Sequence, residues 1–441
     1  MKTFLRTLIV IAITMIAAIV YERYSTQQEF GSSTRLAIFL LVCFALSLAI
    51  TLLSLKTRFH RAVTQLWLTT ISVGLTFVIA DLIAGAFLVE SLSPALSTDK
   101  IRHHKLVPNT RSKFEQPDFS YTQSVNNLGL RGKDRPVEKP SQHFRVILLG
   151  DSFTMGKGVT DQQTFAALLE ASLNQRSGCE STEIEVLNGG VDSYAPILSY
   201  LQLSGDLAPL DPDIILLNLD VSDLLQEAAY RKIASYDSSG EITGVPGSEL
   251  PPTLKQRIRA WLDQHTYFTR LLLFYTDKLF GDKDLTVQGV VARANPELVR
   301  YTLAEDKINR DEQWALIFDS IAKIKQFADQ RSIAFALVIY PWGHQVNDRE
   351  WIPGRYNFVS EGATVSDKYL ETIYRQSQKY GIELVDLFAT FRAYKGEAPL
   401  YFKYDLHWTS EGHKVMAAGL EQYLVKNHSA KWCKSGANSA K

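Results

Sequence analysis

The stretch Val146-Ile147-Leu148-Leu149-Gly150-Asp151-Ser152-Phe153-Thr154 decides the fold. Four apolar residues followed by a Gly-Asp-Ser turn predict a short buried strand that presents Ser152 at its carboxyl end. A serine becomes a good nucleophile only when a base accepts its proton. The distant segment Asp405-Leu406-His407-Trp408 supplies a histidine and a carboxylate, so the two segments together indicate a Ser-His-Asp arrangement.

Apolar strands alternate with helices on both sides of this stretch. Further strands are predicted at Ile184 to Leu187, Ile214 to Leu217, Ala334 to Tyr340 and Ile382 to Val385. Helices are predicted at Thr160 to Asn174 (opened by a Thr160/Gln163 capping box), about Asp311 to Gln330, and Glu411 to Val425. This alternation predicts an α/β domain whose parallel sheet is covered by helices on both faces. Ligands of such sheets bind at the carboxyl ends of the strands, where Ser152, Gly190, Asp223 and Pro341 fall.

The first ninety residues are the most hydrophobic part of the 441-residue chain. Phe4 to Val20, Leu36 to Leu55 and about Ala62 to Leu88 are each long and apolar enough to cross a bilayer, although a cleaved signal peptide is an alternative for the first run. Basic residues precede the first run and fill the turn between the second and third. We therefore expect a multi-pass protein of a cytoplasmic membrane, with the lipid bilayer as a partner and everything after about Ser91 on the periplasmic or extracellular side.

These patterns predict a membrane domain of three transmembrane helices at residues 1–91, a proline-rich extracytoplasmic stem at 92–143 and the α/β domain at 144–430, with a helical insertion at about 228–310. Asp81 in the third run is either a functional intramembrane carboxylate or a group that lies near the interface or pairs with a neighbouring helix. Trp261 to Phe280 in the insertion is a cap over the site, a core helix or a membrane-surface helix. Lysine plus arginine and aspartate plus glutamate number 47 each, so no global charge favours nucleic acid as a partner.

Four sequence blocks, two of them quoted above, carry a family resemblance. They are Asn127-Leu128-Gly129-Leu130-Arg131, Gly150 to Thr154, Asn188-Gly189-Gly190-Val191, and Asp405 to Trp408 with Gly412-His413. Over about residues 126–426 the chain resembles the SGNH (GDSL-type) hydrolases, particularly the membrane-anchored bacterial forms and the related glycan O-acetyltransferases. The resemblance implies a flavodoxin-like SGNH domain and esterase or acyltransferase chemistry.

The resemblance also assigns roles. Ser152 is the expected nucleophile, His407 the base and Asp405 the residue that orients the base; the alternatives are a structural turn at Ser152 and a buried structural histidine. The backbone amides of Ser152 and Gly190 are the expected oxyanion donors, supported by Asp151 and Asp223. The third donor is an asparagine in most members, whereas this chain has Ser222, whose shorter side chain leaves a weakened or inactive site as an alternative. Asp405 lies two residues before His407, whereas many members have three, and the shorter spacing favours the O-acetyltransferase branch.

The expected activity is hydrolysis or transfer of a short acyl group, foremost acetyl, on a cell-envelope glycan or lipid, with a separate membrane protein as acyl donor in the transferase case. No cofactor is expected and no metal site, because His103-His104 lacks accompanying ligands. A catalytically degenerate glycan-binding or polysaccharide-assembly protein is the alternative function, and a signalling or transport module a weaker one. Cys179 and Cys433 follow two helices expected to end at the same edge of the sheet, which predicts a disulfide between them.

Overall fold

The computed structural model describes residues 69, 72–74, 76–81, 83, 96–116, 118–176, 182–247, 268 and 295–432. The chain divides into two compact units. The first comprises residues 1–93 and 251–280, and the second residues 94–250 and 281–441. The sheet and the segments with the sequence motifs belong to the second unit.

The second unit is built on a parallel sheet of five strands. Its strands are β5 (His143–Leu149), β6 (Glu183–Asn188), β7 (Ile214–Leu219), β10 (Ala334–Ile339) and β11 (Glu383–Asp386). They lie in the order β11-β10-β7-β5-β6, and every neighbouring pair is parallel. This is the flavodoxin-like order, so the five predicted strands and the predicted parallel α/β sheet are confirmed.

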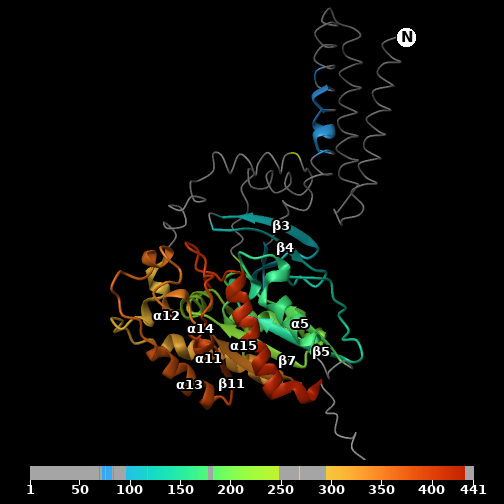
Figure 1. The fold of residues 1–441 in the computed structure, drawn as a ribbon. Helices are drawn as coiled ribbons and strands as arrows, with labels where there is room; N and C mark the ends of the chain where they lie inside the picture. Colours follow the sequence, from blue (N-terminus) through green and yellow to red (C-terminus); the bar gives the residue numbers. More distant parts are fainter. Residues whose placement is uncertain are drawn as a thin grey trace, which may run out of the picture. The chain divides into compact units, whose positions relative to one another are not determined.

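Helices connect successive strands and cover the sheet. Helices α5 (Phe165–Asn174) and α15 (Ser410–His428) pack side by side, as Figure 1 shows. Helices α6 (Pro196–Gln202), α7 (Asp223–Arg231) and α11 (Asp311–Asp329) contact one another in a second group. Because parallel crossovers are right-handed, connections running in opposite directions from β5 place these two groups on opposite faces.

Strand order reverses at β5, and this reversal creates the site. The chain leaves β5 toward β6 at one edge and returns across β5 to β7 on its other side. The loops that follow β5 and β7 therefore part at the carboxyl ends of these strands, which is where open α/β sheets bind ligands. Ser152 follows β5, and Asp220 and Ser222 follow β7.

The remaining described elements are short. They are β1 (Leu96–Asp99), β2 (His103–Leu106), β3 (Thr110–Glu115), β4 (Ser120–Val125), β8 (Ser235–Tyr236), β9 (Ile242–Gly244), α4 (Ser152–Met155), α12 (Gly343–Val346), α13 (Lys368–Lys379), α14 (Phe388–Arg392), the π-helix η3 (Leu203–Leu207), and the 3-10 helices η2 (Asp161–Gln163), η4 (Ala208–Leu210), η6 (Pro296–Leu298), η7 (Arg300–Thr302), η8 (Gly354–Asn357) and η9 (Ser429–Lys431).

Residues 96–125, expected as part of an extended stem, form two antiparallel pairs, β1–β2 and β3–β4. They lie in the same compact unit as the sheet. The reason is side-chain burial: Gln123 and Val125 of β4 and Leu106 of β2 are all buried. The structure therefore differs from the predicted separation of stem and domain.

The helix expected to start at Thr160 starts later. The Thr160/Gln163 capping box is present, but it caps η2, and α5 begins at Phe165 with its own cap, in which the Thr164 side chain accepts from the Ala167 amide. Since 3-10 turns are frequent at helix N-termini, the capping signal marks the first turn and not the α-helix itself.

The expectation of three N-terminal transmembrane helices is contradicted. In the part of the chain that the structure describes, no helix combines the length and the apolar character that crossing a bilayer requires. Phe4 to Val20 and Leu36 to Leu55 lie outside the described residues, as does most of Ala62 to Leu88. An apolar run establishes composition alone, whereas a span needs one continuous helix of about 20 residues.

Other predictions meet the limits of the described residues. Both cysteines of the predicted disulfide, Cys179 and Cys433, lie outside them. So do residues 248–294 of the expected insertion, except Phe268, and with them most of Trp261 to Phe280. Asp81 is buried, and its carboxylate accepts a hydrogen bond of 2.8 Å from the Phe268 amide within the first unit. Of the two alternatives for Asp81, this contact favours the one in which it pairs with a neighbouring segment.

Candidate active site

Ser152 lies at the end of a tight turn between β5 and α4. Gly150 adopts φ +147°, and a Cβ there would lie 2.3 Å from the Thr154 hydroxyl and 3.0 Å from the Asn218 carbonyl oxygen. Only glycine fits that position. The Asp151 carboxylate caps α4 by accepting the Phe153 amide at 2.9 Å. The turn thus ends with Ser152 as the first residue of α4, at the carboxyl edge of the sheet.

The structure brings Ser152, His407 and Asp405 together in one hydrogen-bonded chain. Ser152 Oγ lies 2.6 Å from His407 Nε2, across 255 positions of sequence. On the other side of the ring, His407 Nδ1 lies 2.5 Å from Asp405 Oδ1, which also accepts the His407 amide at 2.9 Å. A carboxylate acceptor keeps the proton on Nδ1, which leaves the Nε2 lone pair for the serine proton.

The Asp405 carboxylate is held in its ionised form. Burial opposes its charge, but the charge and hydrogen bonds of His407 and the ammonium of Lys157 lower the pKa of Asp405 from 3.8 to about 2. Lys157 is half-buried, and its ammonium lies 3.7 Å from the Asp192 carboxylate. Burial disfavours the ammonium, but Asp192 and Asp405 together raise the pKa of Lys157, which therefore stays charged beside the site.

A buried arginine fixes the backbone that follows Ser152. The Arg131 guanidinium donates to the carbonyl oxygens of Met155 and Gly156 and to that of Val159, at 2.9, 2.5 and 2.5 Å. Its Nε donates to Asp161 Oδ1 at 2.9 Å. Burial lowers the Arg131 pKa against the attraction of Asp161. The block Asn127 to Arg131, the first of those that carry the resemblance, therefore shapes the backbone that follows Ser152.

A second support holds the loop that carries Asp405 and His407. Asp118, between β3 and β4, accepts the backbone amides of Tyr404 and Asp405, each at 2.6 Å. The Phe119 ring packs on Phe402 with centroids 4.9 Å apart. Sequence reasoning missed Asp118 because it belongs to the segment expected as a stem. Its only signal is an aspartate in a turn, a residue type that is common in turns generally.

Three buried carboxyl groups, those of Asp151, Asp220 and Asp223, lie close together near the Ser152 turn. Burial, and then the charge of Asp220, raises the pKa of Asp151 well above its usual range, and the two carboxyl groups are hydrogen-bonded to each other. Burial and the charges of Asp220 and Asp151 likewise raise the pKa of Asp223 well above its usual range. Asp220 also accepts the Trp342 indole N–H at 3.1 Å. Like charges this close share protons, so Asp151 and Asp223 are structural acids, and Asp220 is the member that sequence reasoning missed.

Two of the three expected oxyanion donors, Gly190 and Ser222, are engaged within the protein. The Gly190 amide donates to Asn188 Oδ1 at 3.0 Å, and the Ser222 hydroxyl and amide both donate to Asp220 Oδ1 at 2.7 Å. The side-chain amide of Asn218, a residue of β7, donates to the Leu149 carbonyl oxygen at 2.9 Å. The oxyanion roles of Gly190 and Ser222 stay predictions.

The other histidines singled out in the sequence have structural contacts. His413 Nδ1 accepts the Phe165 amide at 3.2 Å, and burial lowers its pKa to about 3, so this neutral ring joins α15 to the start of α5. The Nδ1 atoms of His103 and His104 lie 2.9 Å apart, and His104 Nε2 lies 2.6 Å from the Asp192 carbonyl oxygen. Among the described residues, no group of three or more His, Cys, Asp or Glu has the geometry to hold a metal ion.

Comparison with known proteins adds a family to this geometry. Residues 301–435 match the family model described as the SGNH hydrolase-like domain of the acetyltransferase AlgX. The predicted SGNH resemblance is confirmed. The matched residues contain Asp405 and His407, while Ser152 lies before them. A search of curated proteins finds no match.

Solved structures of esterases are also similar to the chain. The acetyl xylan esterase AlAXEase is 14% identical, with 64% of this chain and 100% of that chain covered and a TM-score of 0.34. The acetylxylan esterase Axe2 from Geobacillus stearothermophilus is 11% identical, with coverage of 63% and 93% and a TM-score of 0.32. A lipase/acylhydrolase from Enterococcus faecalis is 10% identical, with coverage of 64% and 95% and a TM-score of 0.32. Likenesses this weak support no statement about the site.

The family match is thus to a domain described as that of an acetyltransferase, over about a third of the chain. Four of the expected features therefore stand on observation: the family, the parallel sheet, the carboxyl-edge position of Ser152 and its contact with His407. Catalytic roles for individual residues remain to be proposed.

Proposed function

We propose that the chain is a serine ester hydrolase or O-acyltransferase that acts on ester-linked acyl groups, foremost acetyl, of a cell-envelope glycan or lipid outside the cytoplasm. The observation that carries this proposal is the chain of hydrogen bonds from Ser152 Oγ through the His407 ring to Asp405 Oδ1. A structural turn needs no base at hydrogen-bond distance from its serine, and a structural histidine needs no ionised carboxylate behind it.

The reaction follows from the positions of three atoms. His407 Nε2 takes the Ser152 proton as Oγ attacks the ester carbonyl carbon, and Asp405 stabilises the imidazolium that forms. The tetrahedral intermediate collapses when the imidazolium returns that proton to the leaving alcohol, and the acyl group stays on Ser152. Water or a sugar hydroxyl then attacks the acyl-enzyme, with His407 again as base, and the acid or the new ester is released as Oγ regains its proton.

Hydrolysis and transfer share the first half of this cycle and differ in the acceptor. In the transferase case a separate protein supplies the acyl donor. The Gly190 amide can stabilise the oxyanion only if substrate binding draws it away from Asn188 Oδ1. Otherwise the Ser152 amide must stabilise more of the negative charge that develops on the oxygen.

The test uses the purified full-length chain with p-nitrophenyl acetate, with and without an added oligosaccharide acceptor. We expect nitrophenol release with bound acetyl on the chain, and either free acetate or acetylated oligosaccharide by mass spectrometry. Ser152→Ala removes all three products, whereas the matched control Ser204→Ala, at an exposed serine, retains them. Product release by Ser152→Ala at the rate of the unaltered chain would contradict the proposal.

A second function is favoured by one observation. The Ser222 hydroxyl, which stands where an oxyanion donor is expected, is committed to buried Asp220. A chain with this arrangement and no turnover is a glycan-binding or polysaccharide-assembly protein. Restoring the donor with Ser222→Asn distinguishes the two: a gain in turnover of about tenfold or more identifies an active site limited by that donor, because one such donor is worth about 100–1,000-fold.

A further inference from the structure

The segment between Tyr401 and Trp408 is a closed loop. Its ends pair in an antiparallel bridge, and the Phe402 amide donates to the His407 carbonyl oxygen at 3.0 Å. We call residues 402–407 the base loop, because they carry the proposed base. Closure joins the two ends of the loop, so the position of the residues between them depends on contacts from other segments.

One support of the base loop comes from the segment between α12 and η8. The Gly354 amide donates to the Lys403 carbonyl oxygen at 3.0 Å, and the Trp351 indole N–H donates to the Tyr404 carbonyl oxygen at 3.2 Å. Both donors are uncharged groups. They fix two carbonyl oxygens of the loop and leave its amides to other partners.

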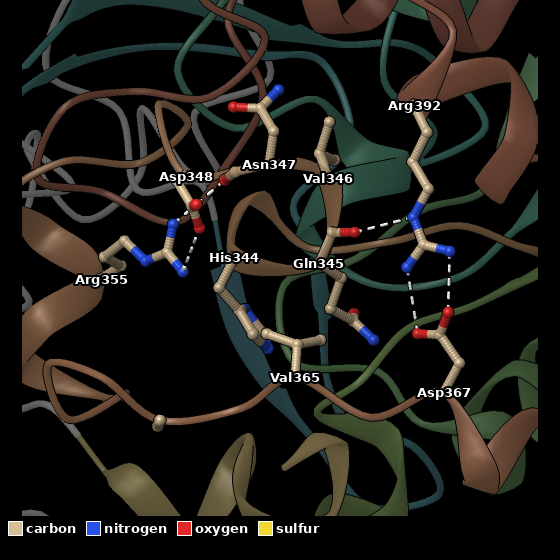
Figure 2. Close-up of a pocket in the computed structure, with 10 residues that line it drawn as sticks. His344, Gln345, Val346, Asn347, Asp348, Arg355, Val365, Asp367 and Arg392 are labelled. Atoms are coloured by element: carbon tan, nitrogen blue, oxygen red, sulfur yellow. Dashed lines mark hydrogen bonds and ion pairs between the residues drawn. The ribbon is translucent and has the colours of Figure 1, made fainter. Parts of the chain in front are cut away.

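A cavity of about 370 Å³ lies beside this segment, but it does not reach the base loop. Figure 2 shows its charged side chains facing one another, Arg392 toward Asp367 and Arg355 toward Asp348. No residue of the base loop and no member of the proposed triad lines it. The charges of the cavity are therefore directed at one another and not at the base loop.

The charged contact of the base loop comes from the turn between β3 and β4. Asp118 Oδ2 accepts the amides of Tyr404 and Asp405, each at 2.6 Å, so one carboxylate oxygen binds two successive residues. Hydrogen bonds to an ionised group are shorter and about twice as strong as neutral ones. Among the described residues, Asp118 is the one carboxylate outside the base loop that accepts an amide of the loop.

The position of the Asp405 backbone decides the geometry of the proposed triad. Asp405 Oδ1 lies 2.5 Å from His407 Nδ1 and also accepts the His407 amide at 2.9 Å. The other ring nitrogen lies 2.6 Å from Ser152 Oγ. Because the carboxylate is joined to the backbone by a single methylene group, a shift of that backbone moves Oδ1 and with it the ring. A displacement of about 1 Å at a reacting group can cost about 100-fold in rate.

The hairpin that carries Asp118 also contacts the backbone after Ser152. The Ser124 amide, in β4, donates to the Asp161 carboxylate at 3.0 Å. The same carboxylate accepts Arg131 Nε at 2.9 Å, and the Arg131 guanidinium donates to three carbonyl oxygens of the backbone after Ser152. The β3–β4 hairpin is thus bonded to both halves of the site.

The hairpin, the base loop and the segment after Ser152 meet at Gly158. A Cβ on this glycine would lie 2.3 Å from the Phe402 ring and 3.2 Å from the Phe119 ring. Gly158 adopts φ +97°, a conformation that glycine takes without strain. The hairpin therefore joins two segments that are more than 200 positions apart in the sequence, close to where their side chains form the Ser152–His407 contact.

We propose that Asp118 is a positioning residue of the reaction: it holds the backbone of Asp405 where the carboxylate can orient His407. The distance from the ring to Ser152 Oγ follows from this placement. The proposal rests on the proposed function in one respect, because Ser152 and His407 are its nucleophile and base. Asp118 transfers no proton, and it acts through the place of its oxygen rather than through its charge.

Two substitutions of Asp118 separate placement from charge. Asp118→Asn loses the charge but keeps an oxygen at the same distance from the backbone, and an amide oxygen also accepts two hydrogen bonds. Asp118→Glu keeps the charge but moves both oxygens by one methylene group. We expect kcat for p-nitrophenyl acetate to fall about 100-fold in Asp118→Glu and in Asp118→Ala, with KM little changed, and to stay within about tenfold of the unaltered chain in Asp118→Asn.

Asp237→Ala is the matched control. Asp237 also accepts two backbone amides in a hairpin turn, those of Ser239 and Glu241 at 2.8 and 2.9 Å, but it is exposed and its described hydrogen bonds stay within its own turn. Its substitution should leave kcat unchanged. The unfolding midpoint of every variant is measured in parallel, because a merely structural role of Asp118 would lower the midpoint without changing kcat of the folded chain.

Proton NMR of the full-length chain gives a readout that needs no turnover. The proton that His407 Nδ1 donates to Asp405 resonates at low field, because a carboxylate acceptor at short distance deshields it. We expect this resonance in the unaltered chain and in Asp118→Asn. It should be shifted or lost in Asp118→Ala and Asp118→Glu, in which the Asp405 backbone is no longer held in place.

The proposal is overturned if Asp118→Glu keeps the kcat of the unaltered chain, or if Asp118→Asn is as slow as Asp118→Ala, since the second result would assign the effect to charge. A lower unfolding midpoint with unchanged kcat and an unchanged resonance overturns it as well. A chain without turnover whose resonance is lost in Asp118→Ala loses the proposed function and retains the placement of Asp405 by Asp118. Turnover that Asp118→Ala leaves unchanged retains the function and overturns the positioning.

Discussion

Asp405→Asn removes the negative charge that we propose Asp405 supplies to His407, while keeping the size of the side chain. The amide has the size of the carboxylate and can still accept the His407 backbone amide, but it has no charge to oppose the imidazolium. Its NH₂ group donates to Nδ1 and so moves the ring proton to Nε2, where it blocks transfer from Ser152. We expect kcat for p-nitrophenyl acetate to fall about 10⁴-fold, the size of effect known for the same change in serine proteases, with KM little altered.

The same substitution has a stability effect that can be worked from the pKa. A change of one pKa unit corresponds to about 1.4 kcal/mol, so a fall from 3.8 to about 2 is worth about 2 kcal/mol to the folded state. Because the folded pKa is the lower one, this stabilisation is present above pH 3.8 and is lost as the pH falls toward 2. Urea unfolding should therefore show the variant less stable by about 2 kcal/mol at pH 7 and pH 5, with the difference shrinking below pH 4.

Asp329→Asn is the matched control, because Asp329 is exposed and pairs with Lys325 only at the surface. Such pairs contribute at most about 1 kcal/mol, and kcat should not change. The reasoning is refuted if Asp405→Asn keeps kcat within tenfold of the unaltered chain. It is also refuted if the stability difference grows as the pH falls, since that would place the folded pKa above 3.8.

Three further substitutions probe the supports of the site. Arg131→Met leaves three buried carbonyl oxygens without their donor and should lower the free energy of unfolding by about 3–5 kcal/mol; a loss below about 1 kcal/mol in urea unfolding would contradict this. Gly190→Ala places a Cβ 2.2 Å from the Met155 amide nitrogen, so stability should fall by about 1–3 kcal/mol and kcat with it, whereas Gly205→Ala, in open space, should change neither. Asp151→Asn should have the stability of the unaltered chain below pH 3.8 and a higher stability at pH 7. The reason is that burial raises the pKa of Asp151 in the folded state, so the unaltered chain loses stability as the pH rises. A stability difference that does not depend on pH would contradict a raised pKa for Asp151.

The sheet was predictable because its signals are local. Each strand is a short apolar run bounded by turn residues, and β7 is buried at all six positions. The order of the strands then follows from right-handed crossovers and the family resemblance. The start of α5 was not predictable from the capping box, because a 3-10 turn and an α-helix use the same cap.

The contacts of Ser152 with His407 and of His407 with Asp405 were predictable from residue types, but the residues that support them were not. Ser152 and His407 each stand in a short motif that marks them in the sequence. Asp118 acts by accepting amides 286 and 287 positions away, and nothing local marks that partnership. The direction of the Ser222 hydroxyl likewise depends on Asp220, whose burial beside Asp151 follows only from the assembled sheet.

Labelling with a fluorophosphonate tests the central claim most directly, because the reagent reacts with a serine only when a base activates it. The full-length chain and Ser152→Ala are treated in parallel and read by intact mass and peptide mapping. The account predicts one adduct per chain, on Ser152, that is absent from Ser152→Ala and slowed in Asp405→Asn. A folded chain that takes up no label, or that is labelled equally in Ser152→Ala, would contradict it.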